Sequence, residues 1–395
     1  LAHEVTNETA RLVVTGGPRE VATPLAEPRW PALVEDLPDG AVRDAVAAAM
    51  WIRAVRPVLS CEIRRTTVAV LNDDAKTVVR VDVVTATGPA SITHVTARPV
   101  LGYDADSATV RTALAGREGV TPTDDTVFDA LLAAAGLPTV TPTATFAADT
   151  SAAVAVADSL RSFAAEIVGN TEGVIDDVDS EFLHDLRVAV RRTRSMLKLV
   201  GDVLPFDITR YIADFKLLGD VTTPTRDLDV YLLEIPDLAA SLTVGAPDDL
   251  DPFRRHIEQT RTHAQRELSL ALRSKRFANL MHDWNRDLDS VSATGPTVSD
   301  IAQQRIRRMY KKVVKVARAL TPESEAEDVH TLRKRCKELR YLLEFFAPVC
   351  EAHNHKAAIK DLKQLQDILG DFQDGEVQSH GLRNIAEEML AGENP

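Results

Sequence analysis

Two periodicities divide the chain at about residue 150. In the first part, the valine-rich runs Thr66–Leu71 and Thr77–Thr85 flank Asn72-Asp73-Asp74, and this pattern predicts a β-hairpin. Ile92–Val100 predicts a further strand that ends near Pro99, as an edge strand or a strand terminus allows. Helical spacing of apolar residues there is confined to three stretches: 41–58, 107–115 and 127–135. The first part is therefore expected to be mixed α and β.

Beyond residue 151, strand-like alternation disappears and apolar residues recur at steps of three and four. This pattern predicts an antiparallel bundle of roughly eight or more helices. The predicted helices are 159–168, 179–199, 208–218, 253–272, 277–288, 301–320, 327–346 and 355–369. The predicted breaks between them are Pro205, the TTPT turn at 222–225, the loop 243–252, Gly295-Pro296, Thr321-Pro322 and Gly370. We expect a domain over 1–140, a Pro- and Thr-containing linker over 141–150 and a helical domain over 151–390.

One helix face in this second part is cationic, and it occurs twice. The first stripe is defined by steps of 3, 4, 3 and 4: His184, Arg187, Arg191, Arg194 and Lys198. The second stripe has the same steps: His330, Arg333, Lys337 and Arg340, closed by Glu344 in place of a cation. At about 100° per residue, each set occupies one narrow face of a helix.

The two stripes are separated by 146 residues (330 − 184 = 146; 344 − 198 = 146). A second motif follows each stripe at nearly the same separation, because Arg226-Asp227 is matched by Gln373-Asp374 (374 − 227 = 147). Agreement of two motifs on one period predicts two related halves, at about 151–240 and 300–390, packed about a pseudo-twofold axis.

Further cations follow helical spacing on other predicted helices. They are Arg305, Arg308, Lys312 and Lys315; Arg266, Arg273 and Arg276; and Lys360 with Lys363. One such column is usually a solvated face, but several columns repel one another unless an anion lies between them. The first stripe spans about 21 Å at about 1.5 Å per residue, which favours a long polyanion over a single phosphate. Arginine grips phosphate oxygens bidentately, whereas lysine and protonated histidine act as point charges.

Composition narrows the choice of polyanion. The formal net charge is −13, which argues against a general nucleic-acid binder. Aromatic residues make up 5% of the chain and do not interleave with the cations, so a base-stacking platform is missing. Inorganic polyphosphate fits better. The histidine at the start of each stripe either caps or packs at the helix N-terminus, or donates to phosphate and binds it more strongly at mildly acidic pH. Neither histidine has metal-ligand spacing, so we expect no metal site and no cofactor.

The motifs resemble the CHAD family, the conserved-histidine α-helical domain. The resemblance rests on HDLRVAVRRTRSMLKLV at 184–200, HTLRKRCKELRYLLEFF at 330–346, RDLDV at 226–230 and LQDILGDFQD at 365–374. It implies a helical-repeat fold that binds inorganic polyphosphate in a central basic groove or pore, without enzymatic activity. It implies phosphate contacts for both stripes. Because Glu344 replaces a cation, we expect the first repeat to hold the polyanion more firmly.

Residues 1–140 resemble a degenerate CYTH domain, which implies a β-rich, tunnel-like fold. The resemblance rests on Arg53 to Pro57, on EIRRT at 62–66, on the hairpin that follows and on Asp82. CYTH enzymes hydrolyse triphosphates with Mg²⁺ held by glutamates of an ExExK strand. Here Glu4 and Glu8 could share one strand face, but Thr6 stands between them and the lysine is missing. Too few carboxylates remain to hold a divalent metal, so we expect no catalytic site.

The sequence therefore predicts an α+β protein that acts as a non-enzymatic polyphosphate adaptor or targeting module. The main alternative is a Mg²⁺-dependent inorganic triphosphatase or polyphosphatase in the CYTH-like domain, with the helical domain binding substrate. A nucleotide or nucleic-acid binder is a third and weaker hypothesis. No long apolar run and no signal peptide are visible, and the three cysteines lack CxxC spacing. We expect a cytoplasmic location, with association to polyphosphate granules as an option, and no membrane partner.

Overall fold

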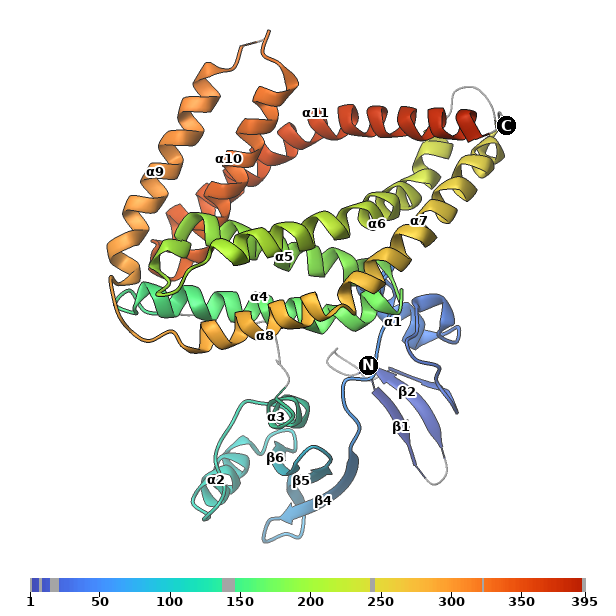
Figure 1. The fold of residues 1–395 in the computed structure, drawn as a ribbon. Helices are drawn as coiled ribbons and strands as arrows, with labels where there is room; N and C mark the ends of the chain where they lie inside the picture. Colours follow the sequence, from blue (N-terminus) through green and yellow to red (C-terminus); the bar gives the residue numbers. More distant parts are fainter. Residues whose placement is uncertain are drawn as a thin grey trace. The chain divides into compact units, whose positions relative to one another are not determined.

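A computed structural model describes residues 2–6, 9–14, 21–136, 146–241, 246–321 and 323–392 (Figure 1). The chain forms two compact units. Unit 1 comprises Leu1–Pro38 and Val55–Thr143, and unit 2 comprises Asp39–Ala54 and Ala144–Pro395. The first half of the predicted linker, 141–145, lies outside the described residues.

Unit 1 contains two separate three-stranded antiparallel sheets in its described part. The first sheet has the order β1 (Ala2–Val5), β2 (Ala10–Val14) and β3 (Val21–Pro24). The second has the order β4 (Glu62–Leu71), β5 (Thr77–Thr87) and β6 (Ser91–Pro99). Three short helices complete the unit: η1 (Val34–Asp36), α2 (Asp104–Ala115) and α3 (Val127–Ala134).

The predicted hairpin is confirmed as the β4–β5 turn. The Asn72 side-chain oxygen accepts hydrogen bonds from the backbone N–H groups of Asp74 (3.2 Å) and Lys76 (2.9 Å). Ala75 has a φ of 59°, and this left-handed residue allows the chain to reverse. The mixed α and β character of the first part is thus confirmed, whereas its tunnel-like, CYTH-like arrangement stays a prediction.

The expectation that Glu4 and Glu8 share one strand face stays a prediction, because Glu8 lies outside the described residues. Strand β1 ends at Val5 and β2 begins at Ala10. Glu4 lies opposite Arg11 in the register, and its carboxylate forms an ion pair with the guanidinium of Arg11 at 2.9 Å.

Unit 2 is helical, and the eight long helices of its described part confirm the predicted bundle. A large apolar core joins them, and its largest fully buried side chains include Trp284, Tyr211, Phe215 and Phe346. The helices are α4 (Ala152–Ile175), α5 (Ser180–Val200), α6 (Thr209–Ser241), α7 (Asp251–Leu272), α8 (Lys275–Asp289), α9 (Val298–Ala319), α10 (Ala326–Phe345) and α11 (Ala352–Gly392). Short helices connect some of them: η2 (Gly201–Val203), η3 (Pro247–Leu250) and η4 (Ala347–Val349). None of the described helices combines the length and the hydrophobicity that a membrane span requires.

The internal duplication is confirmed by the positions at which helices begin. Helices α4 and α9 begin 146 residues apart (298 − 152), and so do α5 and α10 (326 − 180) and η2 and η4 (347 − 201). Helices α4 to α6 therefore form the first repeat and α9 to α11 the second, with α7 and α8 inserted between them (Figure 1).

The two repeats also meet in a symmetric way. Ser151 and Thr297, which are 146 residues apart (297 − 151), form an isolated antiparallel bridge. The Ala152 N–H donates to the Pro296 carbonyl at 2.9 Å, and the Val298 N–H donates to the Thr150 carbonyl at 2.8 Å. When each residue is exchanged for its counterpart 146 positions away in the other repeat, one hydrogen bond becomes the other. A local twofold axis thus passes between the starts of α4 and α9, as an isologous contact requires.

Several predicted boundaries are wrong; helix α4, for example, spans Ala152–Ile175 where 159–168 is predicted. Helix α6 continues through the TTPT segment, with Pro224 and Pro236 inside it, and α11 continues past Gly370. Pro224 removes the N–H that would donate to the Asp220 carbonyl, and in the same turn the hydroxyls of Thr222 and Thr223 both donate to the Gly219 carbonyl at 2.9 Å. Helix α1 (Ala41–Met50) is shorter than 41–58, because Trp51 adopts a left-handed φ of 46°.

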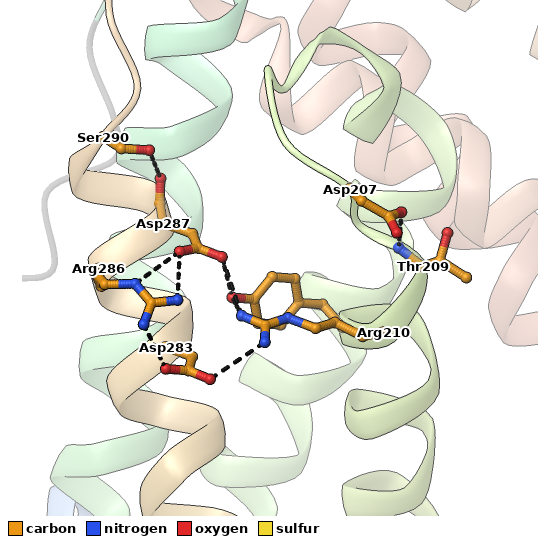
Figure 2. Close-up of polar contacts among 8 residues, drawn as sticks. Asp207, Thr209, Arg210, Asp283, Arg286, Asp287 and Ser290 are labelled. Carbon is orange, nitrogen blue, oxygen red and sulfur yellow. Dashed lines mark hydrogen bonds and ion pairs between the residues drawn. The ribbon is translucent and has the colours of Figure 1, made fainter.

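The inserted helix α8 is joined to α6 by a polar network beside the aromatic core (Figure 2). The Tyr211 hydroxyl donates to the Asp287 carboxylate at 2.5 Å, and Arg210 contacts Asp287 (3.1 Å) and Asp283 (3.3 Å). Burial, followed by the hydrogen bond to Asp287, raises the pKa of Tyr211 to about 12. Tyr211 therefore stays a neutral donor, and the network fixes the insertion onto the first repeat.

Candidate functional site

Helix α5 presents the first stripe because its two faces differ in polarity. Its apolar face buries Leu183, Leu186 and Val190. Asp179 caps the helix, since its Oδ1 accepts hydrogen bonds from the N–H groups of Glu181 (2.8 Å) and Phe182 (3.1 Å). The stripe residues occupy the remaining face: His184 and Arg187 are half-buried, whereas Arg191, Arg194 and Lys198 are exposed.

Arg187 lies at the base of this site and is held by α6. Its Nη1 donates to the hydroxyls of Thr222 (2.8 Å) and Thr223 (2.9 Å), and to the Gly219 carbonyl (3.3 Å). All three acceptors are neutral, so the positive charge of Arg187 is not cancelled by them. Thr222 and Thr223, which belong to the TTPT segment predicted as a turn, thus orient Arg187.

A fourth arginine joins the stripe from α6. Arg226 is half-buried, and its Nη1 lies 3.4 Å from the Ser180 carbonyl and 3.8 Å from the Glu181 carboxylate. Burial, followed by the charge of Arg226, lowers the pKa of His184. Burial also lowers the pKa of Arg187; Asp227 opposes this effect, and the charges of Arg191, Arg226 and Arg194 add to it. The cations are therefore close enough to repel one another.

Arg226 was not predicted from the sequence as a site residue. The Arg226-Asp227 motif is part of the duplication, but the position that matches Arg226 in the second repeat is Gln373. Because Gln373 is uncharged, Arg226 is not found among cations that occur in both repeats. The signal that could have found it is the motif itself, which places a cation on α6 soon after the segment that holds Arg187.

The two stripe helices are in contact with each other. Arg191 Nε donates to the Tyr341 hydroxyl of α10 at 3.2 Å. Lys198 forms an ion pair with Glu338 of α10, and Arg335 contacts the same carboxylate at 2.7 Å. Burial acts to raise the pKa of Glu338, but the hydrogen bonds from Lys198 and Arg335 outweigh it, so the pKa is lowered. The structure thus brings helices α5 and α10 together, through side chains of α10 that lie outside the second stripe.

The second stripe is less open than the first. Its four members, His330, Arg333, Lys337 and Arg340, are all half-buried. Arg340 lies 3.7 Å from the Glu344 carboxylate and 5.5 Å from the centre of the Tyr341 ring. Glu344 therefore not only replaces the fifth cation but also neutralises part of the fourth.

The remaining predicted cations are not all available to a ligand. Arg305 of α9 pairs with Asp202 at 2.6 Å and donates to the Leu199 carbonyl at 3.5 Å, so it ties α9 to the end of α5. Arg276 pairs with Asp214 at 2.9 Å. The others are exposed, and none forms an ion pair among the described residues: Arg266, Arg273, Arg308, Lys312, Lys315, Lys360 and Lys363. The contacts that join α5 to α10 do not include them.

Asp82, one of the carboxylates expected in the CYTH-like domain, is engaged with a hydroxyl and a cation. Asp82 is buried in the β4–β6 sheet, where it accepts a hydrogen bond from Thr67 at 2.6 Å and pairs with Arg98. The Thr67 hydrogen bond and the charge of Arg98 outweigh burial and lower the pKa of Asp82. Over the described residues, no group of three or more His, Cys, Asp or Glu side chains is placed to hold a metal ion.

Arg53, assigned from the sequence to the first domain, belongs to unit 2. Its guanidinium contacts Asp185 at 2.6 Å and Glu181 at 3.0 Å, both on α5. The Ala54 N–H donates to the Asp179 carboxylate at 2.6 Å. These contacts explain why Asp39–Ala54 groups with the helices rather than with the sheets.

Comparison with known proteins finds a matching family, similar sequences and a similar solved structure. The family model described as CHAD domain matches residues 158–383. An uncharacterized protein of Mycobacterium tuberculosis strain ATCC 25618 / H37Rv is 28% identical over 226 residues, which cover 54% of this chain and 42% of that protein. A protein of strain CDC 1551 / Oshkosh is 27% identical over the same length. The chain thus spans less than half the length of these relatives.

Among solved structures, the crystal structure of the CHAD domain from the plant Ricinus communis is similar to this chain. The TM-score is 0.52 at 23% identity, and the match covers 65% of this chain and 92% of that one. A likeness at this identity supports the fold alone.

Proposed function

The chain belongs to the CHAD domain family, and from this premise we propose that unit 2 binds inorganic polyphosphate along the first stripe. The observation that carries the proposal is the cluster of His184, Arg187, Arg191, Arg194 and Arg226. Arg187 is held by neutral acceptors, and Arg191 and Arg194 are exposed. An array of this kind repels itself in the free protein, and a polyanion would relieve that repulsion.

The geometry favours a chain of phosphates. The exposed cations follow one another along the helix, so successive phosphates could each meet one guanidinium or ammonium group. Tyr341 contacts stripe cations of both helices: its hydroxyl accepts a hydrogen bond from Arg191, and its ring centre lies 5.5 Å from Arg340 Cζ. One ring that faces Arg340 does not form a platform for successive bases. Base stacking, on which single-stranded nucleic-acid binding depends, therefore has little support.

We propose that the protein acts as a polyphosphate adaptor or targeting module and not as an enzyme. Glu4 is paired with Arg11, and Asp82 is paired with Arg98 and Thr67. Neither carboxylate is free to bind Mg²⁺, which supports the non-enzymatic function. A cytoplasmic location, with association to polyphosphate granules, belongs to the same proposal.

The binding test is a charge reversal on the exposed part of the stripe. Arg191→Glu with Arg194→Glu should weaken binding of long-chain polyphosphate roughly 100-fold or more, because each arginine–phosphate contact contributes about 1.5 kcal/mol. Arg187 is left in place because it also stabilises the contact of α5 with α6. Isothermal titration at low and high salt would measure the affinity, which should fall steeply with salt in the parent protein.

A matched control is Arg254→Glu with Arg255→Glu on α7, where both residues are exposed and the change in charge is the same. Equal losses in the two double variants would mean that binding follows net charge, and the stripe proposal would be wrong. The rival triphosphatase function is tested separately by phosphate release from tripolyphosphate with Mg²⁺ or Mn²⁺. Turnover that Asp82→Asn abolishes would establish the rival.

A further inference from the structure

The segment before the β4–β6 sheet docks on the end of α5 at which the first stripe begins. Three carboxylates of α5 and its cap receive it. Asp179 accepts the Ala54 N–H at 2.6 Å, Asp185 accepts both Nη atoms of Arg53 at 2.6 and 3.3 Å, and Glu181 accepts Arg53 Nη2 at 3.0 Å. The segment lies outside the family match, which begins at residue 158.

These carboxylates are close to the cations of the stripe. Asp185 is adjacent to His184 in the sequence, and both Asp185 and Glu181 act electrostatically on the His184 imidazole. Glu181 is 8% exposed and uses one oxygen for Arg53 and the other for Arg226, at 3.0 and 3.8 Å. Arg226 in turn is one of the charges that act on His184 and Arg187.

Without Arg53, two carboxylates would face an incoming polyanion with one guanidinium fewer to balance them. Uncompensated carboxylates beside the stripe would repel the negatively charged polyanion and so weaken its binding. Arg53 also fixes the Glu181 carboxylate that contacts Arg226. It therefore has two effects on the stripe: it compensates negative charge and it orients a neighbouring cation.

We propose that Arg53 is a positioning residue of the anion site, through which the 39–54 segment controls how strongly the first stripe binds a polyanion. The inference rests on the proposed function, since it concerns the same site. It adds a control element that reaches the helical repeats from about 100 residues upstream (158 − 53 = 105). Any event that lifts the segment away would weaken the site without changing a stripe residue.

The first test needs no polyanion. In protein with isotope-labelled histidine, the NMR titration of His184, assigned with His184→Gln, should show a higher pKa in Arg53→Ala than in the parent, because Glu181 and Asp185 then favour the imidazolium. In Arg53→Ala with Asp185→Asn, the pKa of His184 should be lower than in Arg53→Ala alone, because one of the two carboxylates is then neutral. The other charged groups near His184, Arg226 and Arg191, are unchanged in both variants.

The second test measures binding of long-chain polyphosphate to the full chain. Arg53→Ala should weaken it about fivefold, which corresponds to roughly one partly screened charge contact. The affinity of Arg53→Lys should lie between those of the parent and of Arg53→Ala. The affinity of Arg53→Ala with Asp185→Asn should return to within about twofold of the parent. Arg43→Ala is the matched control, because Arg43 is on α1 of the same segment and pairs with Asp39 at 2.5 Å.

The outcomes separate the two proposals. A parent protein that does not bind polyphosphate rejects the proposed function, while the titration still decides whether Arg53 sets the charge around His184. An unchanged His184 titration in Arg53→Ala overturns the inference. So does a loss of affinity that Asp185→Asn does not reverse, since Arg53 would then serve only to hold the segment in place.

Discussion

The two stripes carry nearly the same residues at the same spacing, but their surroundings differ. In the first repeat, Arg187 is held by two hydroxyls and a carbonyl, and the next three cations are exposed. In the second repeat, every stripe cation is half-buried and Arg340 lies beside Glu344. A duplicated motif therefore does not imply two equal sites, because burial and neighbouring carboxylates decide which copy presents its charge.

The contact between the repeats reduces this difference at one position. Lys198, the cation that the second stripe lacks, is paired with Glu338 of the second repeat. The advantage of the first stripe therefore depends on Arg191 and Arg194 more than on its fifth cation. The difference between Lys198 and Glu344, on which the expectation was based, therefore accounts for only part of the difference between the repeats.

The largest expected effect comes from neutralising equivalent pairs in the two repeats. Arg191→Gln with Arg194→Gln should weaken polyphosphate binding roughly 100-fold, on the order of 3 kcal/mol for two charge-assisted contacts. Lys337→Gln with Arg340→Gln occupies the positions 146 residues later and should weaken it only about threefold, because Glu344 already offsets part of the charge. Titration calorimetry on both variants measures the ratio, and equal losses would contradict the asymmetry.

The sequence predicted the stripes and their duplication, because 3.6-residue periodicity and an exact repeat are properties of the chain itself. It did not predict that α6 continues through Pro224, since the side-chain hydrogen bonds of Thr222 and Thr223 depend on the neighbouring helix as well as on the segment. It also counted Arg305 as a ligand residue, although Asp202 holds it. The contact of Arg53 with α5 joins positions more than 100 residues apart (185 − 53 = 132), and no local pattern specifies such a pair.

The next effect concerns the buried carboxylate between the repeats. Glu338→Gln should lower the free energy of unfolding by about 2 kcal/mol at pH 7, because Lys198 and Arg335 lose an ionised partner. The folded-state pKa of Glu338 is lowered, so its stabilisation is present above the unfolded value near 4.5 and is lost as the pH falls through the folded value. Urea unfolding at pH 7 and at acidic pH should show the parent and variant converging in acid.

The same variant tests the comparison between stripes from the opposite direction. Glu338→Gln releases Lys198, so the affinity for polyphosphate is expected to rise about threefold while stability falls. Opposite signs for the two quantities are the signature of a competing ion pair. A fall in both would mean that the contact between α5 and α10 matters to the site mainly through its geometry.

A smaller gain is expected from making the second stripe resemble the first. Glu344→Lys restores a cation at the fifth position and removes the carboxylate 3.7 Å from Arg340, so polyphosphate affinity should rise about twofold to threefold. In this background, neutralising Lys337 and Arg340 should cost more affinity than in the parent. If the cost is the same in both backgrounds, Glu344 does not limit the second stripe.

The smallest effect separates helix stability from the position of one arginine. A Cβ at Gly219 would lie 2.8 Å from Arg194 Nη1, at the flexible end of that side chain, so the guanidinium must shift. Gly219→Ala should stabilise α6 by up to about 1 kcal/mol and weaken polyphosphate binding about twofold. The matched control is Gly169→Ala in α4, where a Cβ meets no atom within 4 Å. Thermal unfolding should show that both variants are stabilised, and titration with polyphosphate should show weaker binding only in Gly219→Ala. Weaker binding in both variants would show that stabilising the helices, rather than moving Arg194, reduces the affinity.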